Sequence, residues 1–228
     1  MLQGKAPVQD AAQHQGIAVI AIVDYGAGNL ASVKKAFDFL GAKSVITQDL
    51  SAVRSAKKIV LPGVGHFAAT QAIGTLGLRA PIQQAISAGI PFLGICVGMQ
   101  WMFESSSEAP GIAGLGLLPG VCERFPSSVK SPHVGWNRIC PNKSDNQSRL
   151  LRGLSASGKG SDANPYVYYT HSYRVPVAGD NMQSFAATTE YGGSFAAVVE
   201  KDNAFGVQFH VEKSAEAGLQ ILRNFIGL

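Results

Sequence analysis

A cysteine between two glycines is the first feature of this chain with the chemistry of a catalyst. Cys96 lies in the segment Gly94–Gly98, which has the Gly-x-nucleophile-x-Gly form of a sharp strand-to-helix turn. The strained backbone of such a turn leaves no room for side chains beside the nucleophile, which explains the glycines. The start of the next helix favours a thiolate, and the N–H group of Val97 can face an oxyanion. For this segment alone, a buried structural cysteine remains the alternative.

A second segment supplies groups that could activate such a thiol. The stretch AFGVQFHVEKS, residues 204–214, alternates apolar and other residues. This pattern predicts a strand over 204–211, with His210 and Glu212 projecting on the same side. An imidazole oriented by a carboxylate can take and return a proton, so with Cys96 these residues could form a Cys-His-Glu triad. A solvated strand end with two incidental polar residues is the alternative explanation.

A glycine-rich loop could complete the site. The stretch LPGVGHF, residues 61–67, runs from a predicted strand into Pro-Gly-Val-Gly. Because Gly63 and Gly65 have no side chains, the backbone N–H group of Val64 or Gly65 is free to stabilise an oxyanion. An ordinary turn between a strand and a helix is the simpler explanation of this stretch alone.

Alternating strands and helices are predicted for the first half of the chain. Short runs of β-branched residues indicate strands at residues 17–24, 43–47, 57–65 and 90–95. Apolar residues at helical spacing indicate helices at 29–41, at 66–89 with breaks around Gly77 and Pro81, and after Cys96 at 97–103. This alternation predicts a parallel sheet with right-handed crossovers.

Shorter β-like segments follow from about Gly111, and a helix closes the chain. The segments lie at residues 113–118, 120–125, 133–139, 166–170, 183–189, 194–200 and 204–211, with surface loops over 142–165 and the helix over 214–228. Since no repeat or clean linker divides the chain, we expect one domain over 17–228 after a flexible tail over 1–16. The fold class is α/β, with a mostly parallel sheet, flanking helices and an additional antiparallel β portion.

Composition narrows the class of protein. The chain has 228 residues, of which 46% are hydrophobic and 15% charged, so most of it should fold. The net charge of +4 comes from scattered residues, which argues against a nucleic-acid partner. Three cysteines without a CxxC pair predict neither a disulfide scaffold nor a structural zinc site. With a polar N-terminus and no apolar run near the ~20 residues of a membrane helix, we expect a cytoplasmic protein away from membranes.

Together, these segments resemble the class I glutamine amidotransferases. The matching stretches are PGVG at 62–65, GICVGMQ at 94–100 and GVQFH at 206–210 followed by Glu212, in the family's order, and the resemblance spans about residues 17–228. It implies a doubly wound α/β fold and hydrolysis of glutamine through a γ-glutamyl thioester. Cys96 would be the nucleophile, His210 the general base and then acid, and Glu212 its orienting group. We expect no cofactor and no metal ion.

The resemblance also implies which residues hold the glutamine head group. They are Gln100, Glu108, Tyr166, Ser172 and Tyr173, which match positions that hold the amino and carboxylate ends of glutamine in this family. A zwitterionic substrate needs both donors and acceptors, and these residue types provide them. For Glu108 a surface acid, and for Tyr166 a packed aromatic, remain the alternatives.

Further stretches are similar to one branch, the glutaminase subunits of imidazole glycerol phosphate synthase. They are DYGAGNLASVKKA at 24–36, PHVGWN at 132–137, HSY at 171–173 and EKS at 212–214. The branch implies a heterodimer with a HisF-type TIM-barrel cyclase, which receives the ammonia and makes imidazole glycerol phosphate and AICAR in histidine biosynthesis. Trp136, Asn137 and Lys213 match interface positions; core packing is the alternative for Trp136.

The sequence differs from the family at two places, and it leaves three other functions open. Val211 stands where most relatives have proline, and the first sixteen residues match nothing in the family. The alternatives are a glutaminase serving pyridoxal phosphate or anthranilate synthesis, a catalytically silent scaffold, and an unrelated cysteine hydrolase. We also expect the free subunit to hydrolyse glutamine slowly, because the Pro62–Gly65 loop must turn an N–H group toward the oxyanion.

Overall fold

The computed structural model describes residues 19–142, 148–154, 164–177 and 183–228. The tail expected over residues 1–16 and parts of the loops expected over 142–165 lie outside these ranges.

In the described part of the chain, eight strands form the main sheet in the order β2-β1-β3-β4-β13-β12-β11-β8. The parallel strands are β1 (Ile20–Val23), β2 (Ser44–Thr47), β3 (Lys58–Gly63), β4 (Phe92–Cys96) and β13 (Ala204–Val207). The antiparallel strands are β12 (Ser194–Lys201), β11 (Phe185–Glu190) and β8 (Cys140–Pro141). Strands β1 and β4 are buried throughout because helices cover both faces of the parallel part.

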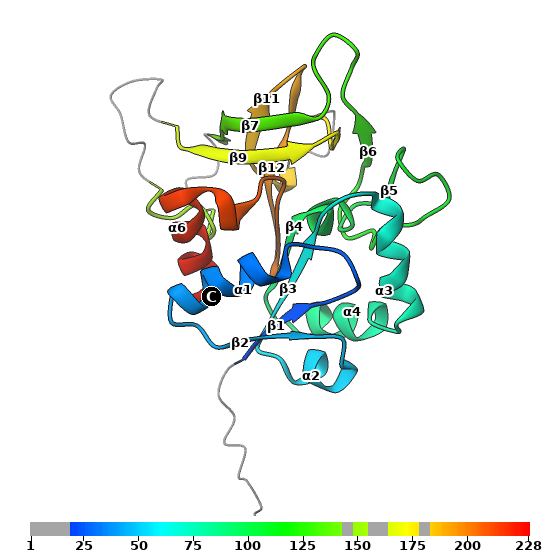
Figure 1. Cartoon of the computed structure of the whole chain (residues 1–228), viewed down its shortest axis with the longest axis vertical. Coiled ribbons are helices and arrows are strands. Elements are labelled where there is room, and N and C mark those ends of the chain that lie inside the picture. Colours follow the sequence, from blue (N-terminus) through cyan, green and yellow to red (C-terminus); the bar gives the residue numbers. More distant parts are fainter. Residues whose placement is uncertain (1–18, 143–147, 155–163, 178–182) are drawn as a thin grey trace, which may run out of the picture.

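Helices flank this sheet on both sides, as a doubly wound fold requires. Figure 1 shows α1 (Leu30–Phe39) and α6 (Ala215–Ile226) on one side and α3 (Gln71–Thr75) and α4 (Arg79–Ser87) on the other. The remaining helices are short: α2 (Leu50–Ser55), α5 (Val97–Gln100) and the single 3-10 turns η1 (Phe67–Thr70) and η4 (Val211–Lys213). The expected fold class is confirmed.

Two small sheets lie above the parallel part of the main sheet in Figure 1. One pairs β7 (His133–Arg138) with β9 (Tyr166–His171) in antiparallel fashion. The other contains β10 (Tyr173–Arg174), β6 (Val121–Arg124) and β5 (Ser105–Ser106). They stand over the carboxyl ends of β3 and β4, which is where open α/β sheets bind their ligands.

Before residue 120, the observed secondary structure departs from the prediction at three places. The helix expected over 97–103 is only the single turn α5. The helix α2 was not expected. Its N-terminal cap is Asp49, whose side chain accepts a hydrogen bond from the N–H group of Ser51. The strand expected over 113–118 is wrong. Its N–H groups donate instead to carbonyls of residues 101–104, folding the segment back on the turn after α5.

The predicted break within residues 66–89 lies at Gly77, which has a φ of +71°. Pro81 does not break the chain, because it sits in the first turn of α4, where N–H groups have no partner within the helix.

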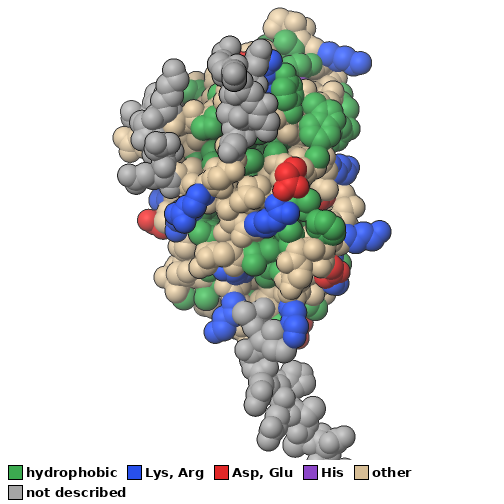
Figure 2. Space-filling view, turned by 90° about the vertical axis from the view of Figure 1, so that its left-hand side faces the viewer, with side chains coloured by type: hydrophobic (Ala, Val, Ile, Leu, Met, Phe, Trp, Pro, Cys, Tyr) green, Lys and Arg blue, Asp and Glu red, His purple; other side chains and the backbone are tan. Residues whose placement is uncertain are grey.

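The charged residues on one face of the molecule are scattered, as they are in the sequence. On the face shown in Figure 2, Lys and Arg side chains are scattered among hydrophobic and polar ones and form no single patch. None of the helices in the described ranges is long and apolar enough to cross a membrane.

Candidate active site

Cys96 lies at a sharp turn between β4 and α5, as the elbow pattern predicts. Its backbone has a φ of +54° and a ψ of −110°, a conformation that residues other than glycine rarely adopt. A Cβ atom on Gly94 would lie 2.5 Å from the carbonyl oxygen of Gly98, and one on Gly98 would lie 1.9 Å from that of Leu61. Both flanking positions therefore need glycine, because the neighbouring backbone leaves no space for a side chain.

The helix that follows Cys96 contributes less than expected. Because α5 covers only Val97–Gln100, it cannot build the macrodipole of a long helix, and only the free N–H groups of one turn remain. Activation of the thiol therefore depends mainly on the base beside it.

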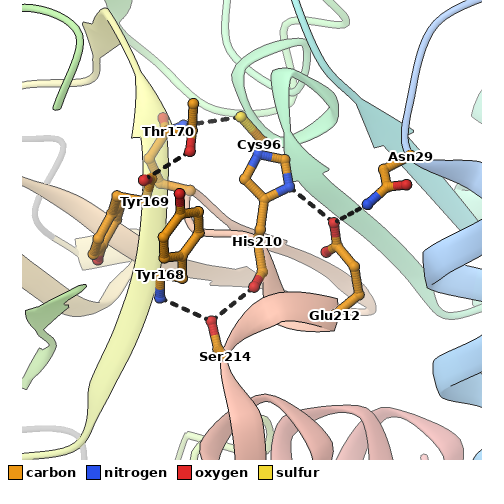
Figure 3. Close-up of polar contacts among 9 residues, drawn as sticks. Asn29, Cys96, Tyr168, Tyr169, Thr170, His210, Glu212 and Ser214 are labelled. Carbon is orange, nitrogen blue, oxygen red and sulfur yellow. Dashed lines mark hydrogen bonds and ion pairs between the residues drawn. The ribbon is translucent and has the colours of Figure 1, made fainter. Parts of the chain in front are cut away.

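His210 and Glu212 are positioned by a turn and not by a strand. β13 ends at Val207, so the expected strand over 204–211 is wrong in its second half, and Glu212 lies in η4. The turn is held by strand β9, since the N–H group of His210 donates to the carbonyl of Tyr168 at 2.9 Å. The Ser214 hydroxyl donates to the carbonyl of His210 at 2.7 Å and accepts from the N–H group of Tyr168 at 3.0 Å (Figure 3).

The imidazole of His210 lies between the thiol and the carboxylate. Its Nδ1 atom is 2.9 Å from Oε1 of Glu212, and its other ring nitrogen faces Cys96 (Figure 3). The amide of Asn29 donates to the same Glu212 oxygen at 3.2 Å. The side chains of His210 and Glu212 are 4% and 0% exposed, so water does not compete for these contacts.

The charges of this cluster are mutually stabilising. Burial by itself lowers the pKa of His210, but hydrogen bonds to Cys96 and Glu212 outweigh burial and raise this pKa to about 10. Burial has the opposite effect on the acid and raises the pKa of Glu212, yet the hydrogen bond and charge of His210 bring this pKa below its ordinary value. His210 is therefore a strong acceptor for the proton of the Cys96 thiol.

Val211, the departure from the family's usual proline, occupies the first position of η4 and is buried. The first N–H groups of a helix have no partner within it, and proline is favoured there for that reason. Valine fits the same backbone, and the His210–Glu212 contact forms in its presence.

A pocket of about 190 Å³ opens beside Cys96, between the elbow and the strands above it. It is lined by Gly65, Cys96, Val97, Gln100, Glu108, Pro132, Thr170, His171, Ser172 and Tyr173. Four of the five expected substrate residues are thus brought together: Gln100, Glu108, Ser172 and Tyr173.

The fifth expected substrate residue, Tyr166, does not lie in this pocket. It starts β9, whereas His171 at the other end of that strand lines the pocket. The Tyr166 side chain is 47% exposed, and its hydroxyl accepts a hydrogen bond from Nε of Arg138 at 2.7 Å. Thr170, four residues from Tyr166, is the nearest β9 residue that lines the pocket, so a strand rise of about 3.3 Å per residue separates Tyr166 from the pocket by roughly 13 Å.

The glycine-rich loop lies beside the nucleophile. Gly63 ends β3 directly opposite Cys96 in the register of β3 and β4. Val64 is exposed, and Gly65 has a φ of +85° and lines the pocket. Glu108 holds the segment after the loop by accepting from the N–H group of Phe67 at 2.7 Å.

Three polar residues near the triad were not singled out as site residues. Asn29 orients Glu212 from the loop before α1. Gln208 donates to the Cys96 sulfur at 3.7 Å and accepts from Gln100 at 3.2 Å. His171 contributes to the pocket wall. Asn29 falls in the stretch DYGAGNLASVKKA, His171 in HSY and Gln208 in GVQFH. The resemblance therefore marked all three stretches, but spacing alone did not show which of their residues reach the site.

His171 forms a buried pair with a second histidine, His133. His171 Nδ1 donates to the carbonyl of Tyr173 at 2.8 Å, so its Nε2 is free to accept from His133 Nδ1 at 3.1 Å. Asn137 donates in turn to His133 Nε2 at 3.3 Å. Burial lowers the pKa of His133 to about 4 and that of His171 to about 3. Both rings are therefore neutral parts of the structure.

The three expected interface residues have different surroundings. Trp136 is 53% exposed on β7, which excludes the core-packing alternative, and it meets the Tyr168 ring edge-on. Lys213 Nζ lies 5.9 Å from the centroid of the same ring. Asn137 faces inward, because its amide also donates to the carbonyl of Glu190. Trp136 and Lys213 are exposed and lie beside the half-buried Tyr168 ring, and these three residues are called here the Trp136 cluster.

Comparison with known families agrees with this geometry. Residues 21–227 match the family described as Glutamine amidotransferase class-I, so the chain belongs to this family. Among solved structures, that of PurLQS from Thermotoga maritima has a TM-score of 0.68 at 20% identity, covering 92% of this chain and 97% of the other. A crystal structure of a glutamine amidotransferase has a TM-score of 0.67 at 15% identity, covering 91% and 97%. At such low identity these likenesses concern the fold alone.

Curated relatives show to which branch of the class I glutamine amidotransferases the chain belongs. Imidazole glycerol phosphate synthase subunit HisH of Salinibacter ruber is 46% identical, over 91% of this chain and 93% of the relative. The protein of the same name from Moorella thermoacetica is 42% identical, over 90% and 93%. Within the class I glutamine amidotransferases, the chain belongs to the HisH family.

Proposed function

We propose that this chain hydrolyses glutamine to glutamate and ammonia as the glutaminase subunit of an imidazole glycerol phosphate synthase. The observation that carries the proposal is the contact of a thiol, an imidazole and a carboxylate from Cys96, His210 and Glu212 beside a pocket of about 190 Å³. A base oriented by a buried acid and aimed at a nucleophile is the arrangement of covalent hydrolases.

In the first half of the reaction, His210 takes the proton of the Cys96 thiol, and the sulfur attacks the side-chain amide carbon of glutamine. The N–H group of Val97, joined by that of Val64 or Gly65, stabilises the negative oxygen that forms. His210 then gives its proton to the amide nitrogen, and the C–N bond breaks to release ammonia and leave a thioester on Cys96.

In the second half, His210 takes a proton from water while the water oxygen attacks the thioester carbon. The C–S bond breaks, glutamate leaves, and His210 returns the proton to the Cys96 sulfur. Glu212 keeps the imidazole in one orientation and balances its positive charge in both halves, with Asn29 holding the carboxylate.

The glutamine head group is held by residues of the pocket wall. The Glu108 carboxylate suits the ammonium group of glutamine, and the side chains of Gln100, Ser172 and Tyr173 supply further polar contacts. Since the Gln100 Nε2 atom donates to the carbonyl of Tyr173 at 3.0 Å and to Gln208 at 3.2 Å, its side-chain oxygen is left to accept a hydrogen bond from the substrate.

The ammonia is consumed by a partner, a TIM-barrel cyclase of the HisF type in a heterodimer, which makes imidazole glycerol phosphate and AICAR. The subunit name of the curated relatives supports an assembly, and the Trp136 cluster supplies an aromatic anchor with a lysine beside it. Free thiols at Cys96, Cys122 and Cys140 fit a reducing cytoplasm as the site of this reaction.

The partner also sets the rate of glutamine hydrolysis. The loop over Pro62–Gly65 must present an N–H group to the oxyanion, and loss of one such donor typically costs about 10²–10³ in rate. Docking of the cyclase next to this loop would favour the conformation in which the N–H group faces the oxyanion. Equal glutamine turnover by the free and the complexed chain would contradict this part of the proposal.

The test combines the chain with a HisF-type cyclase and its ribonucleotide substrate, adds glutamine, and measures glutamate and imidazole glycerol phosphate. Replacing Cys96 with Ala should abolish both products from glutamine, a loss of at least about 10⁴ in rate, because no other nucleophile is present at the elbow. The same variant with added ammonia should make product at the wild-type rate. Unchanged glutamine-dependent synthesis in Cys96→Ala would mean a silent scaffold.

A further inference from the structure

The hydroxyl group of Tyr25 is buried without a hydrogen-bond partner in the described part of the chain. The residue is 3% exposed, and it follows strand β1 by two positions. A buried hydroxyl that gives up water without gaining a partner destabilises the fold. Native proteins keep few such groups, and each calls for a reason such as a role at an active site.

The position of this hydroxyl is next to the oxyanion loop. Strands β1 and β3 run parallel with Ile22 opposite Val60, and continuing that register brings Tyr25 level with Gly63. A Cβ atom built on Gly63 would lie 2.6 Å from Oη of Tyr25 and 2.8 Å from the backbone nitrogen of Gly98. The hydroxyl therefore sits between the end of β3 and the first turn of α5, the two segments that supply the oxyanion donors.

The hydroxyl can act only as a neutral donor or acceptor. Burial first, and the neighbouring Cys96 second, raise the pKa of Tyr25 well above its ordinary value. Tyr25 is not one of the described residues that line the pocket beside Cys96. It therefore does not reach the substrate, and it lies on the inner side of the loop.

The geometry points to Tyr25 as a positioning residue for the oxyanion loop, an inference that rests on the proposed glutaminase function. In a trans peptide the carbonyl and the N–H group point in opposite directions. When the peptide between Gly63 and Val64 turns its N–H group into the pocket, its carbonyl turns inward, where the Tyr25 hydroxyl can donate to it. Gly65, with a φ of +85°, gives the loop backbone freedom for this turn, and Gly63 has no side chain to collide with Tyr25.

The test is Tyr25→Phe, which removes only the hydroxyl and keeps the packed ring. In complex with the cyclase, we expect kcat for glutamine hydrolysis to fall by about 10- to 100-fold, part of the effect of losing one oxyanion donor. KM for glutamine and the ammonia-dependent rate should stay at wild-type values. The unfolding free energy of the free variant should be equal to or higher than that of wild type, because an unpaired buried hydroxyl is gone.

Tyr169→Phe is the matched control, since this buried hydroxyl has a partner, Thr189 Oγ1, at 2.7 Å. It should lower stability and leave kcat unchanged. Wild-type kcat in Tyr25→Phe, or a loss of kcat accompanied by a loss of stability, would overturn the role of Tyr25. The proposed function is tested separately by Cys96→Ala in the same assay; a wild-type complex that releases no glutamate would overturn both.

Discussion

Histidines in the two halves of the molecule have opposite electrostatic environments. At the end of the parallel half, His210 is buried between an acid and a thiol, and its pKa is raised to about 10. In the antiparallel β7–β9 sheet, His133 and His171 are buried among aromatic rings, and their pKa values are lowered to about 4 and about 3. Burial lowers the pKa of all three histidines, so the difference between their pKa values comes from the groups that they contact.

The comparison separates a reactive imidazole from structural ones. Hydrogen bonds to Cys96 and to the Glu212 carboxylate raise the pKa of His210 and suit it to the proposed role of base, whereas neutral neighbours such as Tyr169 and the carbonyl of Tyr173 keep the other two rings uncharged. The consequences for stability have opposite signs. The contribution of His210 is complete below about pH 6.5 and is lost as the pH rises through about 10. Those of His133 and His171 are present above about pH 6.5 and are lost as the pH falls through about 4 and about 3.

The largest effect should come from removing the negative charge that faces His210. Glu212→Gln should lower kcat for glutamine hydrolysis by roughly 10³–10⁴-fold, because the imidazole loses both its orientation and its counter-charge. The pKa of His210, followed by NMR, should fall from about 10 toward its ordinary value.

The control for this change is Glu216→Gln. Glu216 is an acid on α6 with 76% side-chain exposure that pairs with Arg223 at the surface. Both the rate and the titration of His210 should stay at wild-type values in this variant. A His210 pKa that stayed near 10 in Glu212→Gln would mean that the thiol alone sets it, and the comparison between the two halves would fail.

A second, smaller effect concerns the antiparallel half as a docking surface. Trp136→Ala should weaken binding to the cyclase by about 10- to 100-fold, since an exposed indole is a typical interface anchor. The stability of the free chain should change little. Phe39→Ala, which removes a 73% exposed aromatic at the end of α1, should leave the affinity unchanged. Titration calorimetry measures these affinities for the cyclase. Equal affinities of wild type and Trp136→Ala would show that Trp136 on the β7–β9 sheet is not part of the interface.

The smallest effect tests the structural histidines directly. Between about pH 4 and pH 6.5 the unfolded chain binds a proton at residue 133 that the folded chain does not, so stability should rise with pH. In His133→Asn, which can still donate toward His171, that rise should become shallower by up to about 1.4 kcal/mol per pH unit. Urea unfolding at several pH values measures the slope. An unchanged slope would show that His133 is protonated in the folded chain.

The sequence by itself determined the elbow, the order of the catalytic segments and the fold class. Gly94 and Gly98 are required by the backbone at Cys96, and short continuous apolar runs, which are buried in the structure, mark β1, β3 and β4. These features are local, because they depend on the backbone angles and burial of neighbouring residues. The resemblance to class I glutamine amidotransferases added the triad roles, which stay proposals until they are tested.

Only the tertiary structure decided which side chains meet. Asn29 and Glu212 are 183 positions apart and come together because of how α1 and η4 are packed. Strand alternation gave the wrong reason for the His210–Glu212 contact, since strand β9 bends the chain after Val207 by hydrogen bonds that no local pattern encodes. The exclusion of Tyr166 from the pocket and the exposure of Trp136 likewise follow from the pairing of β7 with β9, a long-range choice of partners.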